Sequence, residues 1–198
     1  MTGAFTGAAG GWRAALVLAG WLAAGTACSV VGGGDRLSDA QQVIADMKIG
    51  PSGLTIVGGV DRADRAYRVG EPIVLSAEVN RVAYVAVLRV LPNGATTLVF
   101  PNKAQPGAQV AANSPLRIPA PGVATRLSGD QPGAVLFEFI ASANGSSWLF
   151  GRKPQGAADF AELGTTTRAL AKDIVDSLKS GPGRDTAVAS VVVRVAAP

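Results

Sequence analysis

Hydrophobic positions dominate residues 81–102, where two apolar runs flank Pro92-Asn93-Gly94. The first run, 82–91, is rich in Val, Tyr and Leu, and the second, 96–100, is β-branched and aromatic, as is typical of strands. Asn-Gly favours the positive backbone angles of a tight hairpin turn. The pattern therefore predicts a β-hairpin. Because both faces of 82–91 are apolar, we expect that strand to lie centrally in a sheet and to be covered on both sides.

Two more segments alternate with the period of a half-buried strand. In residues 73–79 every second side chain from Ile73 is apolar, and in residues 134–141 those starting at Val135 face the predicted core. Further strands are expected at 54–57, 116–118 and 186–195, the last of which is apolar enough to be internal. The polar segment 58–67, which contains Asp61, Arg62, Asp64 and Arg65, is expected to form a loop.

Helical spacing appears near both ends of the chain. Ser38 and Gln41 form a capping-box pattern ahead of Val43, Ile44 and Met47, and Gly50-Pro51 is expected to end this helix. Thr165-Thr166-Thr167 precedes apolar positions at 170, 174, 175 and 178, with Gly181-Pro182 as the stop signal. A helical turn is expected at 160–163.

These elements predict the fold class. About seven strands joined mainly by turns, without strand–helix alternation, favour a mainly β, antiparallel β-sandwich with one or two peripheral helices. An immunoglobulin-like layout is one option for it. Residues 38–198 are expected to form one domain, a length within the usual range for domains.

The start of the chain has the pattern of an export signal. Trp12-Arg13 precedes a mostly apolar run, 14–24, that is shorter than the roughly 20 residues needed to span a bilayer, and small residues follow. Residues 1–27 are therefore predicted to be a signal peptide of the lipoprotein type. Residues 28–37, with three consecutive glycines, are predicted to be a flexible tether.

Cys28, the single cysteine of the chain, follows directly and resembles the acylated cysteine of a bacterial lipobox. Ala27 and Thr26 fit that motif, whereas Gly25 stands where it prefers Leu. Gly25 and Ala27 also satisfy the rule of the ordinary signal peptidase. Both interpretations place Cys28 at the mature N-terminus, and we expect it to be lipidated because a lone exported thiol has no other partner. Ser29 resembles an outer-membrane sorting residue, which predicts an outer-membrane lipoprotein facing the periplasm.

Composition restricts the chemistry. One cysteine and no histidine exclude an intrachain disulfide, a zinc site with Cys and His ligands, a Ser-His-Asp triad and a Cys-His dyad. No metal or other cofactor is expected. The formal charge of +4, from 18 basic and 14 acidic residues, is weak evidence for an anionic partner. Because the basic residues are scattered singly, no nucleic-acid binding is expected.

Two sets of residues are candidates for a site. Phe100, Asn102, Lys103 and Trp148 are a candidate binding rim, although an Asn in such a turn more often caps backbone groups. Glu138 is a carboxylate on a largely apolar strand face, where burial would raise its pKa toward that of a general acid. The alternatives for Glu138 are an edge position or an ion pair with an arginine such as Arg89.

Several motifs resemble one bacterial family. They are Gly-Glu-Pro-Ile at 70–73, Tyr-Val-Ala-Val-Leu at 84–88, Asn-Gly at 93–94, Leu-Val-Phe-Pro-Asn at 98–102, Leu-Arg-Ile-Pro at 116–119 and Pro-Gly at 132–133. Together they resemble the bacterial domain of unknown function DUF4384 over residues 68–150. The resemblance implies an extracytoplasmic β domain, sometimes attached to protease-like or kinase-like modules, and implies no active site.

Three functions remain in view at this level. The first is a non-catalytic cell-envelope lipoprotein whose sandwich binds another envelope protein, with the sandwich lipoprotein of a type VI secretion complex as a specific variant. The second is a glycan- or peptidoglycan-binding module that stacks on Trp148, Phe150 and Tyr67. The third, least favoured, is a hydrolase that pairs Glu138 with Asp130, Asp159 or Glu162. The oligomeric state is not predicted.

Overall fold

The computed structural model describes residues 36–47, 52–179 and 185–197. The predicted leader, Cys28 and the tether as far as residue 35 lie outside the described residues. So do Gly50-Pro51 and Gly181-Pro182, the two expected helix stops.

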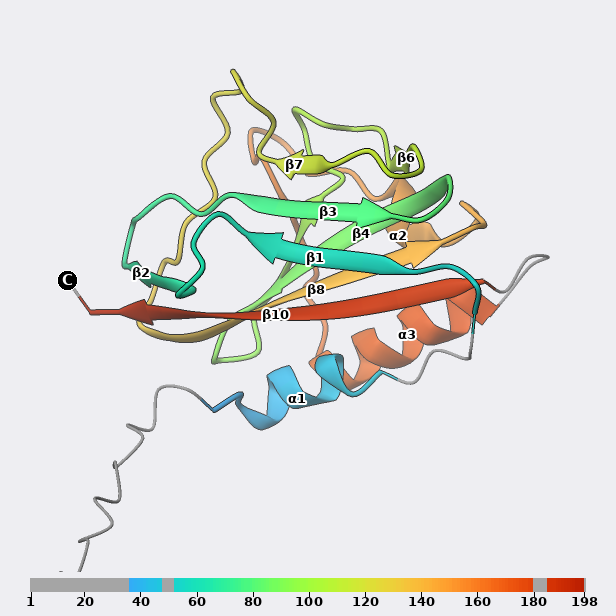
Figure 1. Cartoon of the computed structure of the whole chain (residues 1–198). Coiled ribbons are helices and arrows are strands. Elements are labelled where there is room, and N and C mark those ends of the chain that lie inside the picture. Colours follow the sequence, from blue (N-terminus) through green and yellow to red (C-terminus); the bar gives the residue numbers. More distant parts are fainter. Residues whose placement is uncertain (1–35, 48–51, 180–184, 198) are drawn as a thin grey trace, which may run out of the picture. The chain divides into compact units, whose positions relative to one another are not determined.

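The described residues form two sheets of unequal size (Figure 1). The small sheet has the order β1 (Ile56–Val60), β3 (Leu75–Val79) and β7 (Leu116–Ile118). The large sheet has the order β2 (Ala66–Arg68), β10 (Thr186–Ala196), β8 (Gly133–Ser142), β4 (Ala83–Val90), β5 (Thr96–Phe100) and β9 (Ala161–Glu162). β6 (Gln109–Val110) pairs with β4 outside this path. All described strand pairs are antiparallel except β2–β10.

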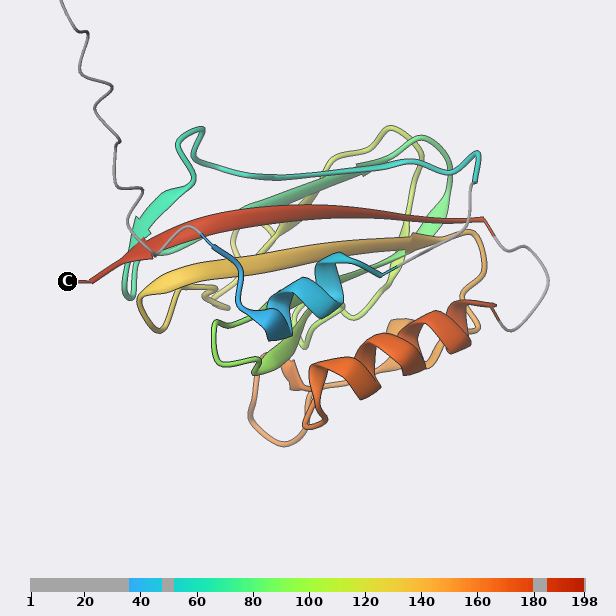
Figure 2. The ribbon, with the colours of Figure 1, turned by 90° about the horizontal axis from the view of Figure 1, so that it is seen from below.

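Three helices accompany the sheets: α1 (Asp39–Ala45), α2 (Trp148–Gly151) and α3 (Thr167–Lys179). α1 and α3 lie against the face of the large sheet that points away from the small sheet (Figures 1 and 2). The predicted mainly β sandwich with peripheral helices is therefore confirmed. The strand orders differ from the four-plus-three arrangement of an immunoglobulin domain, so that optional layout does not apply.

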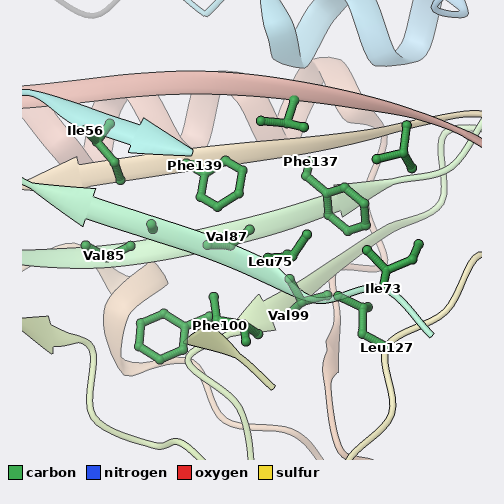
Figure 3. Close-up of a cluster of buried hydrophobic side chains, with 14 of the residues drawn as sticks. Ile56, Ile73, Leu75, Val85, Val87, Val99, Phe100, Leu127, Phe137 and Phe139 are labelled. Atoms are coloured by element: carbon green, nitrogen blue, oxygen red, sulfur yellow. The ribbon is translucent and has the colours of Figure 1, made fainter. Parts of the chain in front are cut away.

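Two hydrophobic clusters hold the layers together. The inter-sheet cluster contains Val85, Val87, Phe137 and Phe139 of the large sheet, together with Leu75 of the small sheet (Figure 3). The helix-side cluster contains the opposite faces of β4 and β8 with α1, α2 and α3. β4 contributes to both clusters and pairs with β5 and β8, which confirms its predicted central place.

The N-terminal helix forms where its capping box predicts. Ser38 Oγ accepts a hydrogen bond from the Gln41 backbone N–H, and Ser38 N–H donates to Gln41 Oε1. The fully buried Gln41 side chain also donates to the carbonyls of Val90 and Ala134, at 2.9 and 2.7 Å. One glutamine therefore both caps α1 and fastens it to the end of the large sheet.

Three local predictions were wrong. Residues 58–60, expected in a loop, continue β1, because Gly58 lets that strand cross closely over Phe139. A Cβ at Gly58 would lie 2.5 Å from Cδ2 of the Phe139 ring. The end of the same expected loop, residues 66 and 67, belongs to β2, and part of the expected helical turn at 160–163 is strand β9.

Candidate functional site

The predicted binding rim is divided by the structure. Phe100 and Asn102 are each 2% exposed, whereas Lys103 is exposed. Phe100 belongs to the inter-sheet cluster, while Leu149 and Phe150 of α2 belong to the helix-side cluster. Phe100 and the helix that carries Trp148 therefore pack on opposite faces of the large sheet, so the structure does not bring these two rim candidates together.

Asn102 has the structural role that was the alternative to binding. Its Oδ1 accepts hydrogen bonds from the backbone N–H groups of Ala104 and Gln105, and its Nδ2 donates to the carbonyl of Val99. Both polar atoms of its side chain are thus engaged in shaping the turn. A shallow cleft of about 270 Å³ opens nearby, lined in part by Phe100, Gln105 and Gln109. The Gln105 amide is itself engaged, with Arg117 O and Ala120 N.

The aromatic platform expected for a glycan site is not present. Tyr67 and Phe150 are 2% and 6% exposed, so their faces are not available for stacking on a sugar. The Tyr67 hydroxyl donates to Asp61 Oδ1 at 2.7 Å, and burial together with this hydrogen bond raises the pKa of Tyr67. Of the three aromatic residues only Trp148, at 38%, is exposed.

Glu138 is completely buried on the helix-side face of β8. Burial raises its pKa to about 7, and a hydrogen bond from the Ser190 hydroxyl to Oε2 opposes this shift. Oε1 has no hydrogen-bond partner. The carboxyl group is therefore held in a setting that favours its neutral form at a pH below 7.

The charged partners expected for Glu138 lie elsewhere. Arg89 occupies the opposite face of β4 and binds Asp130 at 2.9 Å and the Ser128 carbonyl at 3.0 Å, so the predicted Arg89–Glu138 pair was wrong. No carboxylate contributes to the pKa shift of Glu138. Asp130 instead pairs with Arg89, and Asp159 and Glu162 are exposed, so none of the three candidate partners shares the buried position of Glu138.

The described residues offer two further observations on the kind of site to expect. None of their helices has the length and apolar character needed to cross a membrane. Within the same part of the chain, no three acidic, cysteine or histidine side chains gather as metal ligands.

An unpaired sheet edge is the most distinctive feature that the sequence did not predict. β10 pairs with β8 over 186–195, but on its other side β2 pairs only with Arg194–Ala196 (Figure 1). The predicted internal position of β10 is thus correct only at its C-terminal end. Over Thr186–Val193 the outer edge has no strand partner among the described residues.

The backbone groups that face outward on this edge can be identified. Arg194 N–H donates outward to the Arg65 carbonyl at 2.8 Å, and within a strand outward-facing residues alternate. The N–H and C=O groups of Val188, Ser190 and Val192 therefore point away from β8. Residues 186–193 contain no proline and no charged side chain, the features by which edges are usually protected from pairing.

Comparison with known proteins supports the family resemblance. Residues 66–144 match the family described as Domain of unknown function (DUF4384), which confirms the resemblance seen in the motifs. The match extends from β2 to the end of β8. No match was found among the curated proteins or among the solved structures.

Proposed function

We propose that this protein is a non-catalytic lipoprotein of the cell envelope that binds another envelope protein by adding a strand of that partner to the free edge of β10. The observation that carries the proposal is the outer edge of Thr186–Val193, an uncharged segment that has no strand partner on that side among the described residues. A row of backbone donors and acceptors without a strand partner is a template for an incoming strand. Main-chain hydrogen bonds supply affinity in this mode, and alternate side chains supply specificity.

The side chains of the edge define the partner strand. Val188 and Val192 are half-buried against the helix-side cluster, and Ala187 and Ala189 are half-buried against the inter-sheet cluster. A strand placed beside them would extend both clusters by one position. We therefore expect an extended partner segment that is uncharged and alternates small or β-branched residues on its two faces.

Anchoring at the membrane completes the proposal. The leader and Cys28 support export and acylation, and the tether would hold the domain off the lipid surface. We expect the domain to face the periplasm from the outer membrane. The glycan-binding alternative loses two of its three stacking residues to burial. Among the described residues, no feature specifically favours the more specific alternative, the sandwich lipoprotein of a type VI secretion complex.

Substitution at the edge tests the proposal. Ala189→Lys puts a charge in the middle of the free segment, where a long side chain can reach solvent while its backbone stays paired with β8. Ala196→Lys is the matched control, because Ala196 is exposed on the same strand where β2 already pairs. After crosslinking of membranes from the native host, we expect Ala189→Lys to lose a partner that the native protein and Ala196→Lys retain. Equal capture by all three proteins would contradict the proposal.

A further inference from the structure

A second surface, separate from β10, has the features of a ligand site. A cleft of about 250 Å³ lies between the segment entering β3, strand β7 and the loop 119–127. Ile73 and Leu127, which are 0% and 1% exposed, are among its lining residues and lie side by side at one end of the inter-sheet cluster (Figure 3). The Ile73 N–H donates to the Leu127 carbonyl at 2.8 Å, which fixes these two segments to each other.

The walls of the cleft are preformed. Pro72, Pro119 and Pro121 line it, and each restricts the local backbone. The Gln105 amide bridges the Arg117 carbonyl and the Ala120 N–H, at 2.9 and 3.0 Å, and so holds both sides of Pro119. A site that needs little ordering on binding loses less affinity to entropy.

The charges around the cleft have one sign. Arg117 and Arg126 both line it and both are exposed, and no acidic residue is among its lining residues. The ion pairs of the described residues involve Arg62, Arg81, Arg89 and Lys172, but neither of these two arginines. Thr125 adds a hydroxyl group to the lining. The accessible apolar surface of the cleft includes Pro72, Pro119 and Pro121. Together with two guanidinium groups that form no ion pair among the described residues, it favours a ligand that joins an apolar body to an anion.

We propose that this cleft binds an acidic peptide segment, with an apolar side chain against the accessible rings of Pro119 and Pro121 and a neighbouring carboxylate at Arg117 and Arg126. The volume admits about one side chain with its adjoining backbone, since a water molecule occupies roughly 30 Å³. The charge of the chain without the predicted leader, 17 − 14 = +3 because Arg13 is removed, is weak further support for an anionic partner. The inference is independent of strand addition, because it involves neither β10 nor its free edge.

The probe is the blocked tripeptide acetyl-Leu-Glu-Leu-amide, titrated into the purified protein while amide and methyl NMR signals are followed. We expect shifts at Val74 and Ala120, which line the cleft and are partly exposed, and weaker binding by acetyl-Leu-Gln-Leu-amide. The double variant Arg117→Gln/Arg126→Gln should bind the Glu peptide at least about tenfold more weakly, as expected for loss of charged hydrogen bonds. Arg168→Gln, on the exposed face of α3, removes the same type of charge and should leave binding unchanged.

Several results would overturn the inference. They are the absence of shifts at millimolar peptide, equal binding of the Glu and Gln peptides, and equal losses in the Arg117→Gln/Arg126→Gln and Arg168→Gln variants. A second arm of the experiment measures binding of the native protein and of the double variant to vesicles that contain phosphatidylglycerol. If the double variant lost vesicle binding and kept peptide binding, the arginines would serve a lipid surface and the peptide assignment would be wrong. Folding of the variants is checked by their methyl spectra, since both arginines are on the surface.

Discussion

Ser190, exposed in the middle of the free edge of β10, donates its hydroxyl to the completely buried carboxyl group of Glu138 on the neighbouring strand β8. The two residues are directly opposite each other in the strand register. The edge proposed to bind a partner is therefore linked by a side-chain hydrogen bond to a titratable group in the interior. Oε1 of the same carboxyl group remains without a partner.

The first prediction concerns pH. The pKa of Glu138 is raised by burial from 4.5 to about 7, so the folded protein holds a proton there that the unfolded chain has lost. The stabilisation that this proton gives is complete below pH 4.5 and is lost as the pH rises to 7. The free energy of unfolding should fall by roughly 3 kcal/mol over this interval.

Urea unfolding at a series of pH values measures this fall. In Glu138→Gln, which keeps an acceptor for Ser190 and cannot ionise, most of the decline should disappear. Glu78→Gln is the control, because Glu78 is exposed on β3 and should leave the pH profile unchanged. A Glu138→Gln profile that parallels that of the native protein would show that Glu138 ionises normally.

A second prediction concerns the close approach of β1 to β8. In Gly58→Ala the new Cβ would lie 2.5 Å from Cδ2 of the buried Phe139 ring, so strand or ring must move. Overpacking of this kind costs about 1–3 kcal/mol of stability. Gly53→Ala, where no atom lies within 4 Å of the added Cβ, should change the free energy of unfolding by less than about 0.5 kcal/mol. Equal effects in the two variants would contradict the packing described here.

A third prediction concerns the attachment of α1. Gln41→Met keeps side-chain volume but leaves the Val90 and Ala134 carbonyls without their buried donor. We expect a loss of about 1–3 kcal/mol and faster amide hydrogen exchange in α1. Gln42→Met, at an exposed position of the same helix, should affect neither quantity appreciably. Native exchange rates in α1 of Gln41→Met would mean that other contacts attach the helix.

A fourth prediction concerns the anchor. In the native host, a fatty-acid analogue should label the protein and the label should be lost in Cys28→Ser. The labelled protein should fractionate with the outer membrane, and Cys28→Ser should appear in the soluble periplasmic fraction. Labelling that persists in Cys28→Ser, or native protein retained in the cytosol, would refute the proposed anchor.

Sequence patterns predicted much of the fold for identifiable reasons. Period-two alternation correctly predicted that Leu75, Ala77 and Val79 share one buried face. Asn93-Gly94 correctly predicted the hairpin, in which Gly94 has a φ of +85°. The capping box at Ser38 and Gln41 gave the start of α1. These signals are local, so that they can be recognised without tertiary structure.

The failures have tertiary causes. Residues 58–60 look like a loop in the sequence because two glycines interrupt the apolar pattern. In the structure they belong to β1, and Gly58 has no side chain because the Phe139 ring occupies the space that a Cβ would need. β10 appeared internal because residues on both of its faces are apolar. Those faces are covered by helices and by the small sheet, while over Thr186–Val193 the outer edge has no strand partner among the described residues. Face burial and edge pairing are separate properties, and alternation reports only the first.

The candidate site was predicted less well than the fold. Phe100 and Asn102 were grouped with Trp148 by residue type, but burial and packing separate them. Glu138 was correctly expected to have a raised pKa, because its strand neighbours are apolar, while its partner Ser190 is 52 residues away in the sequence. The run from 186 to 193 without charge or proline is the one sequence signal that could have indicated an unprotected edge.

The most direct test of strand addition is site-specific photocrosslinking in living cells of the native host. A benzophenone amino acid placed at Ala189, within the free edge of β10, should form an adduct with one polypeptide, and the same residue placed at Arg168 on α3 should not. Mass spectrometry of the adduct should place the crosslink in an extended, uncharged segment of the partner. Absence of an adduct at Ala189, or the same adduct from Arg168, would contradict the account.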